Sequence, residues 1–423
     1  MNTKKSTKST FILADAVLPF ILVTTLFFMW GIPNNLNGVL IKQFMKSMEL
    51  SRFQAGLIQS AFYMGYFVLA VPAAMLMKKY SYKTGIVFGL LLYAAGCLLF
   101  WPAAIMGQYG FFLLALFVIA SGLAFLETGA NPFIALLGSA ETSEQRLNFS
   151  QAFNPIGAIV GVLLGTFFIF SGVEPDETKI SAMKLSGEYS VFLQQETLRV
   201  VKPYLALAVF AFIWALLIMK VKFPRLETPK SELPDSKGSF RYLLRFPHFW
   251  KGVLAQFFYV GAQVGTWSYF IPYVQDYTNQ PEKIAGYLLT GTLVAFGIGR
   301  FSATWLMRYI QPAKLMGLYS FINVVLVLIS ILLPGWIGMW AILFTSFFMS
   351  LMYPTIFACS IKGLGENTKI GGSILVMSII GGALCTPLMG YIAELSHSMA
   401  IAMVVPLVAY LYILYYSFYG TQN

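Results

Sequence analysis

The chain carries very little charge for its length. Asp, Glu, Lys and Arg make up only 11% of its 423 residues, against about 25% in an ordinary soluble domain. Apolar residues make up 58%, and a soluble fold with that share cannot keep its surface polar enough to stay dispersed. The composition excludes an ordinary soluble protein and predicts one whose surface faces lipid.

Cysteine and histidine are also scarce. Cys97, Cys359 and Cys385 are isolated within apolar stretches, which excludes a disulfide framework and favours a role as small packing residues. With two histidines besides, the sequence predicts no metal site. It also lacks the Gly-rich loop ending in Lys-Ser or Lys-Thr that binds ATP phosphates. We therefore expect no cofactor and no ATP-driven step.

Apolar runs long enough to cross a bilayer recur along the whole chain. A spanning helix needs roughly 20 mostly apolar residues, and the pattern predicts twelve such spans. Their approximate positions are 17–42, 53–79, 83–104, 109–139, 147–171, 201–222, 249–277, 284–308, 312–333, 335–363, 370–394 and 398–419. The first run follows Lys4, Lys5 and Lys8 as in a signal peptide, but it is long, contains Pro33 and has no small-residue cleavage site. We interpret it as a retained first helix.

The basic residues predict an orientation. The net charge of +11 comes from Lys and Arg scattered through short loops, which argues against nucleic-acid binding. With a cytoplasmic N-terminus, about 19 of them fall on the cytoplasmic side and about 8 on the other, as the positive-inside rule requires. An even number of spans places the C-terminus in the cytoplasm too. The segment from Ser171 to Val200 is then predicted to be an external surface loop that could hold a short helix.

A polar segment near the middle predicts a division of the chain. Residues 223–248 are rich in Pro, Ser, Glu and Lys and contain no long apolar run, as in a linker. The predicted parts are a cytoplasmic tail at 1–16, a six-helix bundle at 17–222, a cytoplasmic linker at 223–248 and a second six-helix bundle at 249–423. Short motifs recur at consistent offsets in the two bundles: residues 75–78 and 305–308, Pro132 and Pro354, Gly157 and Gly381. The predicted fold class is all-α and polytopic, with twelve transmembrane helices in two pseudo-symmetric bundles.

Glu127 is the one acidic residue of the sequence that falls deep inside a predicted span. Insertion of such a group costs roughly 2.5–3.5 kcal/mol, so a function is expected for it. Asn131, four residues on, shares its helix face. Facing a cavity, Glu127 could carry a proton, since burial favours the neutral carboxyl, or accept a hydrogen bond from a sugar hydroxyl. The alternative is a structural glutamate bonded to a neighbouring helix.

Arg300 is the basic counterpart of Glu127, roughly two turns from the predicted cytoplasmic end of its helix. Three interpretations stay open for it. The guanidinium could bind substrate, it could pair with a carboxylate or a helix C-terminus to lock a gate, or it could extend along its aliphatic stem to the cytoplasmic interface.

Amide and aromatic side chains share faces of several predicted spans. In the first span, three asparagines stand beside Pro33 and two glycines, which predicts a broken helix of the kind that lines transporter sites. Amides donate and accept together, as sugar hydroxyls require. The residues predicted to line a central polar cavity are Asn34, Asn35, Asn37, Glu127, Asn131, Gln151, Asn154, Tyr259, Gln263, Trp267, Arg300 and Tyr353. Asn148 and Gln256 lie on the same faces. No cluster of basic residues accompanies them, which favours a neutral solute, and interhelical hydrogen bonding is the alternative for each amide.

Several segments along almost the whole chain carry a family resemblance. They are residues 53–63, 126–128, 130–133, 253–257, 259–263, 299–301 and 353–357. With them the chain resembles the fucose permease family of sugar transporters, within the major facilitator superfamily. The resemblance implies a sugar/proton symporter of the bacterial inner membrane that works by alternating access, with Glu127 serving both substrate and proton. We expect a functional monomer whose partners are a small sugar, a proton and the lipid bilayer.

One position departs from the pattern of that family. Proton-coupled members usually have an aspartate after the asparagines of the first span, and this chain has Gly38 there. Three alternatives follow: Glu127 carries the proton alone, the coupling ion is sodium, or the protein is an uncoupled facilitator. The sugar is expected to be L-fucose or a related hexose. An enzyme is not expected, because Glu127 has no companion acid within a span to form a catalytic pair.

Overall fold

The computed structural model describes residues 12–13, 16–138, 146, 149–224, 243–307, 309–361, 364 and 368–420. Every regular element within these ranges is a helix, which confirms the predicted all-α class. Most of the predicted linker and of the predicted N-terminal tail lies outside the described residues, so these boundaries stay predictions.

The helices before the linker form the first group. They are α1 (Val17–Ser47), α2 (Arg52–Lys79), α3 (Tyr82–Leu98), α4 (Phe100–Met106), α5 (Tyr109–Leu136), α7 (Phe153–Leu164), α8 (Glu177–Ser186), α9 (Glu188–Leu198) and α10 (Val201–Lys220), with a π-helical turn η3 (Gly165–Ile169). The second group follows the linker. It comprises α12 (Pro247–Thr278), α13 (Glu282–Leu306), α14 (Pro312–Leu332), α15 (Trp336–Met349), α16 (Met352–Ile361), α17 (Thr368–Met377), η5 (Ser378–Ile380), α18 (Gly381–Ser396), α19 (Met399–Ala402), α20 (Val404–Tyr415) and η6 (Tyr416–Gly420).

Eleven helical stretches of the described chain are long and apolar enough to cross a membrane. Each overlaps one of the predicted spans, although the stretch Glu188–Lys220 begins well before the predicted span 201–222. The remaining predicted span, 249–277, lies in α12, which has 32 residues and is not among the eleven. Its length suffices for a span, so the difference is one of composition: polar side chains such as Gln256 and Gln263 lower its hydropathy.

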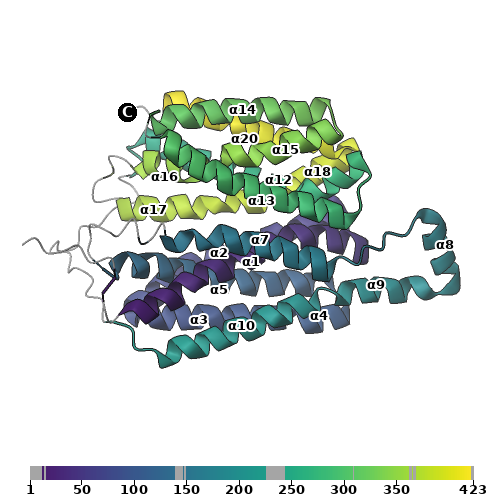
Figure 1. The fold of residues 1–423 in the computed structure, drawn as a ribbon, viewed down its shortest axis with the longest axis horizontal. Helices are drawn as coiled ribbons and strands as arrows, with labels where there is room; N and C mark the ends of the chain where they lie inside the picture. The colour runs from purple at the N-terminus through teal and green to yellow at the C-terminus, as the bar shows by residue number, and fades with distance from the viewer. Residues whose placement is uncertain are drawn as a thin grey trace, which may run out of the picture.

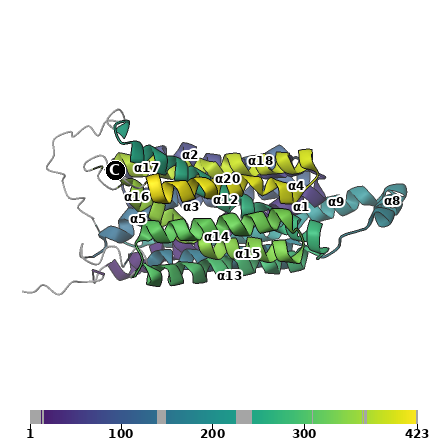
Figure 2. The same ribbon diagram turned by 90° about the horizontal axis from the view of Figure 1, so that it is seen from above.

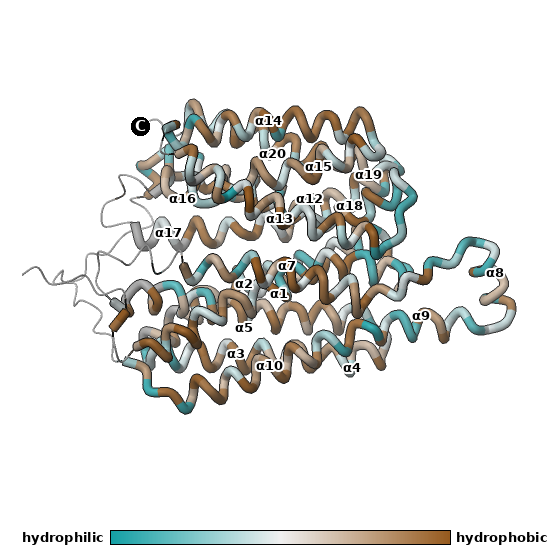
Figure 3. Tube along the Cα trace, viewed as in Figure 1, coloured by the Kyte–Doolittle hydropathy of each residue, from teal (hydrophilic) through white to brown (hydrophobic). Residues whose placement is uncertain are grey.

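The two helix groups lie side by side along their length. In Figure 1 the first group (purple to teal) occupies the lower part and the second group (green to yellow) the upper part. The main contacts between them join α2 to α18, α1 to α12 and α7 to α13. Figure 2 shows α8 and α9 projecting far beyond one end of the bundle, and Figure 3 shows that end richer in hydrophilic residues than the helix centres. We call this end the outer face, after the predicted orientation, and the opposite end the inner face.

The predicted external loop at 171–200 is mostly helical. Asp176 caps α8 by accepting a hydrogen bond from the Lys179 N–H at 2.8 Å. Gly187, at φ 77°, allows the reversal from α8 into α9. The Tyr189 hydroxyl of α9 donates to the Glu49 carboxylate at 2.9 Å. The loop is therefore a helical hairpin that is attached to the end of α1.

The predicted break in the first span is wrong, because α1 continues through Pro33. A proline lacks the N–H that would bind the carbonyl four residues earlier. Here that carbonyl, on Met29, lies 3.5 Å from the Tyr93 hydroxyl, which donates to it. In the next turn, Asn35 donates its side-chain amide to the Gly31 carbonyl at 3.0 Å. Bonds from side chains thus support the helix where the sequence weakens it.

Two glycines that recur in the sequence make the same contact in the two groups. A Cβ on Gly157, in α7, would overlap the carbonyl oxygen of Phe28 in α1. A Cβ on Gly381, at the start of α18, would overlap the carbonyl oxygen of Phe257 in α12. Small residues allow such close approach of transmembrane helices. The internal repeat therefore has a structural counterpart, in which one pair of helices touches backbone to backbone in each group.

This contact predicts a stability loss on adding one methyl group. Gly157→Ala and Gly381→Ala are each expected to destabilise the protein by about 1–3 kcal/mol, because an overpacked interface must move apart. The measurement is the thermal unfolding midpoint of the purified protein in detergent. Gly297→Ala is the matched control, since it is also helical but a Cβ there meets nothing within 4 Å. Equal midpoints for all three variants would contradict the proposed contact.

Candidate functional site

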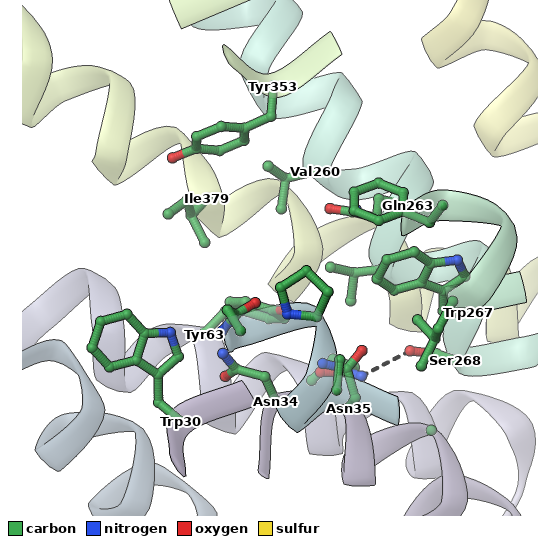
Figure 4. Close-up of a pocket in the computed structure, with 18 of the residues that line it drawn as sticks. Trp30, Asn34, Asn35, Tyr63, Val260, Gln263, Trp267, Ser268, Tyr353 and Ile379 are labelled. Atoms are coloured by element: carbon green, nitrogen blue, oxygen red, sulfur yellow. Dashed lines mark hydrogen bonds between the residues drawn. The ribbon is translucent and has the colours of Figure 1, made fainter. Parts of the chain in front are cut away.

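A cavity of about 300 Å³ lies between the two helix groups. This volume is at the low end of the range for small-molecule sites, about 300–1,000 Å³. Helices α1, α2, α5 and α7 line it from the first group, and α12, α13 and α16 from the second. Figure 4 shows Trp30 and Asn34 on one side of the space and Gln263, Trp267 and Tyr353 on the other. A solute in this cavity would touch both groups at once.

Most of the predicted site residues line this cavity. They are Asn34, Asn35, Glu127, Asn131, Gln151, Asn154, Tyr259, Gln263, Trp267, Arg300 and Tyr353. Asn37 does not: its side chain is fully buried and donates to the Gln59 side-chain oxygen at 3.2 Å. Asn34 and Asn37 are three residues apart, so their side chains leave the helix in directions about 60° apart. Only Asn34 lines the cavity. The binding role of each lining residue stays a prediction.

The Glu127 carboxyl group faces the cavity and is partly exposed there. Tyr63, Tyr66 and Tyr353, which come from both helix groups, line the same cavity. Glu127 makes no hydrogen bond or ion pair with another side chain that the structure describes. A carboxyl group placed in this way can exchange a proton with the cavity and can accept a hydrogen bond from a solute.

Hydrogen bonds within the first helix group hold the amide side chains beside Glu127. Asn131 donates to the Glu127 backbone carbonyl at 3.0 Å, and its own side-chain oxygen accepts from Gln151 at 3.4 Å. Asn154 donates to the Phe27 carbonyl at 3.3 Å. Each amide keeps a further donor or acceptor, which a solute hydroxyl can use. Asn148, on the same predicted face, lies outside the described residues.

Arg300 lies in the second group, with its guanidinium over the ring of Phe296 at 4.9 Å. That ring meets Trp267 edge to face, with 5.3 Å between centroids, and the Trp267 indole N–H donates to the Ser346 hydroxyl at 3.0 Å. The Tyr259 hydroxyl is buried without a partner among the described atoms. This side of the cavity is therefore lined mainly by aromatic rings.

Reasoning from the sequence missed several lining residues. They are Phe27, Trp30, Gln59, Tyr63, Tyr66, Ser268 and Phe296. Gln59, Tyr63 and Tyr66 follow one another at helical spacing in α2, so their shared face was a usable signal. A stripe of aromatic residues is, however, more often core than site. Gln256 shows the opposite error, because it is fully buried, does not line the cavity and has both amide atoms without partners.

Polar contacts between the groups close the outer side of the cavity. Gln59 and Ser268 are the outermost lining residues of α2 and α12, and the Gln59 amide donates to the Ser268 hydroxyl at 2.8 Å. Next along α2, the Ser60 hydroxyl donates to the Ala383 carbonyl at 2.6 Å. At the end of α2, Tyr269 donates to the Arg52 carbonyl at 2.6 Å.

Lys46 lies at the centre of a buried charge cluster on the outer face. Its ammonium group is 2.8 Å from a Glu282 carboxylate oxygen of the second group and 2.7 Å from a Glu196 oxygen of the first. Glu282 also accepts from the Gly172 backbone N–H at 2.9 Å. The side chain of Lys46 is 10% exposed and that of Glu282 0%. The cluster links α1, α9 and α13 when the groups meet.

Comparison with known proteins identifies the architecture. The family model described as Major Facilitator Superfamily matches residues 20–385. The chain belongs to the major facilitator superfamily. It is 44% identical to the L-fucose-proton symporter of Escherichia coli (strain K12) over 414 residues, which are 96% of this chain and 94% of that protein. It is 34% identical to a glucose/galactose transporter of Brucella abortus biovar 1 (strain 9-941) over 407 residues, which are 95% and 93%.

Solved structures of the superfamily share the fold. The crystal structure of the fucose transporter FucP in the outward conformation has 42% identity and a TM-score of 0.71, and covers 97% of this chain and 100% of that one. A bacterial homologue of the lysosomal transporter Spinster, in an inward-facing conformation, has 16% identity and a TM-score of 0.74, and covers 96% and 97%. At that identity the second likeness shows the fold alone. The predicted superfamily and its two-bundle fold are confirmed.

Proposed function

We propose that the chain imports a neutral monosaccharide, L-fucose or a related hexose, together with a proton. The observation that carries this proposal is the cavity, in which amide and aromatic side chains from both groups surround one carboxyl group, Glu127. The similar Escherichia coli and Brucella abortus proteins are named as an L-fucose-proton symporter and a glucose/galactose transporter. Those names support a hexose and a proton as the transported species.

Alternating access supplies the cycle. Sugar and proton enter from the outer side when the groups separate there, and the contacts around Gln59 and Lys46 then re-form behind them. Opening at the inner face releases both into the cytoplasm. We place the protein in the bacterial inner membrane as a multi-pass monomer with both termini cytoplasmic, in agreement with the predicted distribution of Lys and Arg.

The test is uptake into proteoliposomes that contain only this protein. A panel of labelled sugars, L-fucose, D-galactose and D-glucose among them, is offered with a pH gradient or a sodium gradient imposed separately. Accumulation above the external concentration with the pH gradient alone supports proton symport. Accumulation with sodium alone, or equilibration without accumulation, supports the alternative functions of a sodium symporter or an uncoupled facilitator. Absence of saturable sugar uptake contradicts the proposal.

Gly38 is the residue that favours those alternatives. It lines the cavity, and a Cβ on it would lie 3.3 Å from the Trp267 carbonyl oxygen and 3.7 Å from a Leu289 methyl group. A larger side chain at position 38 would therefore have to share the tight contact between α1 and α12. No carboxylate from α1 lines the cavity, so a proton symporter built on this chain has Glu127 as the carboxyl group available for coupling in the cavity.

Gly38→Asp is expected to change how uptake depends on pH, because it adds a second ionisable group to the cavity. Gly38→Asn is the matched control, since it has the same shape and meets the same crowding beside Trp267 but cannot ionise. The measurement is the initial rate of sugar uptake between pH 5 and 8. We expect an altered profile for the aspartate variant and the wild-type profile, at reduced rate, for the asparagine variant. Identical profiles for both would remove position 38 from the coupling.

A further inference from the structure

A short chain of hydrogen bonds crosses from one helix group to the other at the outer end of the cavity. The Asn37 amide of α1 donates to the Gln59 side-chain oxygen at 3.2 Å. The Gln59 amide then donates to the Ser268 hydroxyl of α12 at 2.8 Å, and Figure 4 draws this bond as the dashed line that ends on Ser268. Gln59 is only 3% exposed, yet it lines the cavity.

The two bonds of Gln59 differ in what happens when the outer face opens. Asn37 belongs to the same helix group as Gln59, so their bond survives a rigid-body separation of the groups. Ser268 belongs to the other group, so its bond with Gln59 must break. The Gln59 amide N–H is then left without its acceptor but is still oriented by Asn37. In the outer-open state this N–H faces the water-filled opening, where the hydroxyl of an entering solute can replace water as its acceptor.

We propose that Gln59 is a sugar-binding residue of the outer-open state only, and that it exchanges a sugar hydroxyl for the Ser268 hydroxyl as the outer face closes. This inference rests on the proposed sugar transport. The exchange balances one hydrogen bond against another, so closure leaves no unpaired donor. The closed cavity holds the sugar with one contact fewer than the outer-open cavity does.

An asymmetry of affinity follows. Sugar offered from outside gains the Gln59 contact, and sugar offered from inside meets a Gln59 already bonded to Ser268. A hydrogen bond of this kind changes affinity by about 3- to 10-fold. The half-saturating sugar concentration is therefore lower on the outer side, which suits uptake from dilute solution and release into the cytoplasm.

A purely mechanical role for this bond predicts changes of the opposite sign. If the Gln59–Ser268 bond only held the outer face shut, its loss would increase the outer-open population. Outside affinity would then rise and inside affinity would fall for a change at either residue. Under the proposed exchange, Gln59→Met lowers outside affinity because the donor is gone. Ser268→Ala raises inside affinity because Gln59 stays free to hold the sugar.

The experiment measures the half-saturating concentration of sugar for exchange from each side. Right-side-out and inside-out membrane vesicles expressing the full chain are used, and the sugar is the one that the wild-type protein exchanges best. The variants are Gln59→Met, Ser268→Ala and the double variant. Ser60→Ala is the matched control, because it removes the neighbouring bond between the groups, to Ala383 at 2.6 Å, but Ser60 is not among the residues found to line the cavity.

The expected pattern separates the two sides. Gln59→Met raises the outside value by about 3- to 10-fold and leaves the inside value unchanged, and Ser268→Ala lowers the inside value by a similar factor. In the double variant the inside value returns to that of the wild type, because Gln59 is no longer present to hold the sugar. The inference is overturned if a variant changes the half-saturating concentration equally on both sides. It is also overturned if all variants behave like Ser60→Ala. Neither result contradicts the proposed sugar transport. Absence of sugar exchange by the wild-type protein overturns the proposed function and this inference with it.

Discussion

Glu127→Gln is expected to abolish uphill accumulation of sugar while downhill exchange continues. The amide keeps the size and hydrogen-bonding ability of the carboxyl group but cannot release a proton. A pH gradient of one unit is worth about 1.4 kcal/mol, so one proton per sugar sustains about tenfold accumulation. In the variant the accumulation ratio should fall to about one. The measurement is the sugar ratio across proteoliposomes under that gradient, together with exchange at equal pH.

Glu127→Asp tests whether the position of the carboxyl group matters as well as its ability to ionise. Aspartate keeps an ionisable group on α5 but withdraws it by one methylene, so partial accumulation is expected. The cavity around this residue is shared with Tyr63, Tyr66 and Tyr353, whose hydroxyls cannot replace the carboxyl group at neutral pH. Full accumulation by the glutamine variant would exclude Glu127 from the coupling and would favour the sodium-coupled or uncoupled alternative.

Lys46→Met is expected to shift the protein strongly towards an open outer face. The substitution leaves the Glu282 carboxylate, which is 0% exposed in the closed state, buried beside Glu196 without the ammonium group that contacts both of them. Removing one partner of a buried ion pair costs about 3–5 kcal/mol, or more than 100-fold in the closed population. When the groups separate, Glu282 reaches water and the cost disappears. Sugar exchange, which requires closure, should slow accordingly.

The measurement is the distance between spin labels at Gln195→Cys in α9 and Leu395→Cys in α18, with the native cysteines replaced. Both positions are exposed and they belong to different helix groups. The double variant Lys46→Met with Glu282→Gln should recover much of the closed population, since no charge is stranded across the interface. The outer face should stay closed in Glu196→Gln, because the ion pair between Lys46 and Glu282 remains. An unchanged distance in Lys46→Met would show that the cluster does not hold the outer face.

The fold could be predicted where a local pattern decides it. The apolar runs located the spans because burial in lipid depends on composition over about 20 residues. The predicted break at Pro33 is wrong, because the Tyr93 hydroxyl donates a hydrogen bond to the Met29 carbonyl that lacks its usual helical N–H donor. Tyr93 is distant in sequence, so no local pattern reveals this bond. The segment 171–200 is predicted to be an external loop with room for a short helix, and the structure has two helices there, α8 and α9. Its polar composition gives no apolar periodicity from which their extent could be predicted.

The candidate site divides in the same way. Glu127, Asn131 and Arg300 could be found because a polar group within an apolar run is conspicuous and expensive. The prediction that Asn37 lines the cavity is wrong, because residues spaced by three point only approximately in the same direction and Asn37 points at Gln59 instead. Gln59 could not be assigned to the cavity from the sequence, because a single glutamine in a transmembrane helix is as often bonded to a neighbouring helix.

Composition and the position of each polar residue were enough to predict a membrane protein of many spans, with an amide-rich interior, one deep carboxyl group and one deep guanidinium group. These properties follow from composition and from the cost of each residue in lipid, which need no knowledge of neighbours. The contacts that close the outer side of the cavity could be identified only from the three-dimensional arrangement of the helices. Lys46 and Glu282 are 236 residues apart, and Gln59 and Ser268 are 209 apart. Such pairs exist only because the two helix groups pack against each other, and no local sequence pattern specifies that packing.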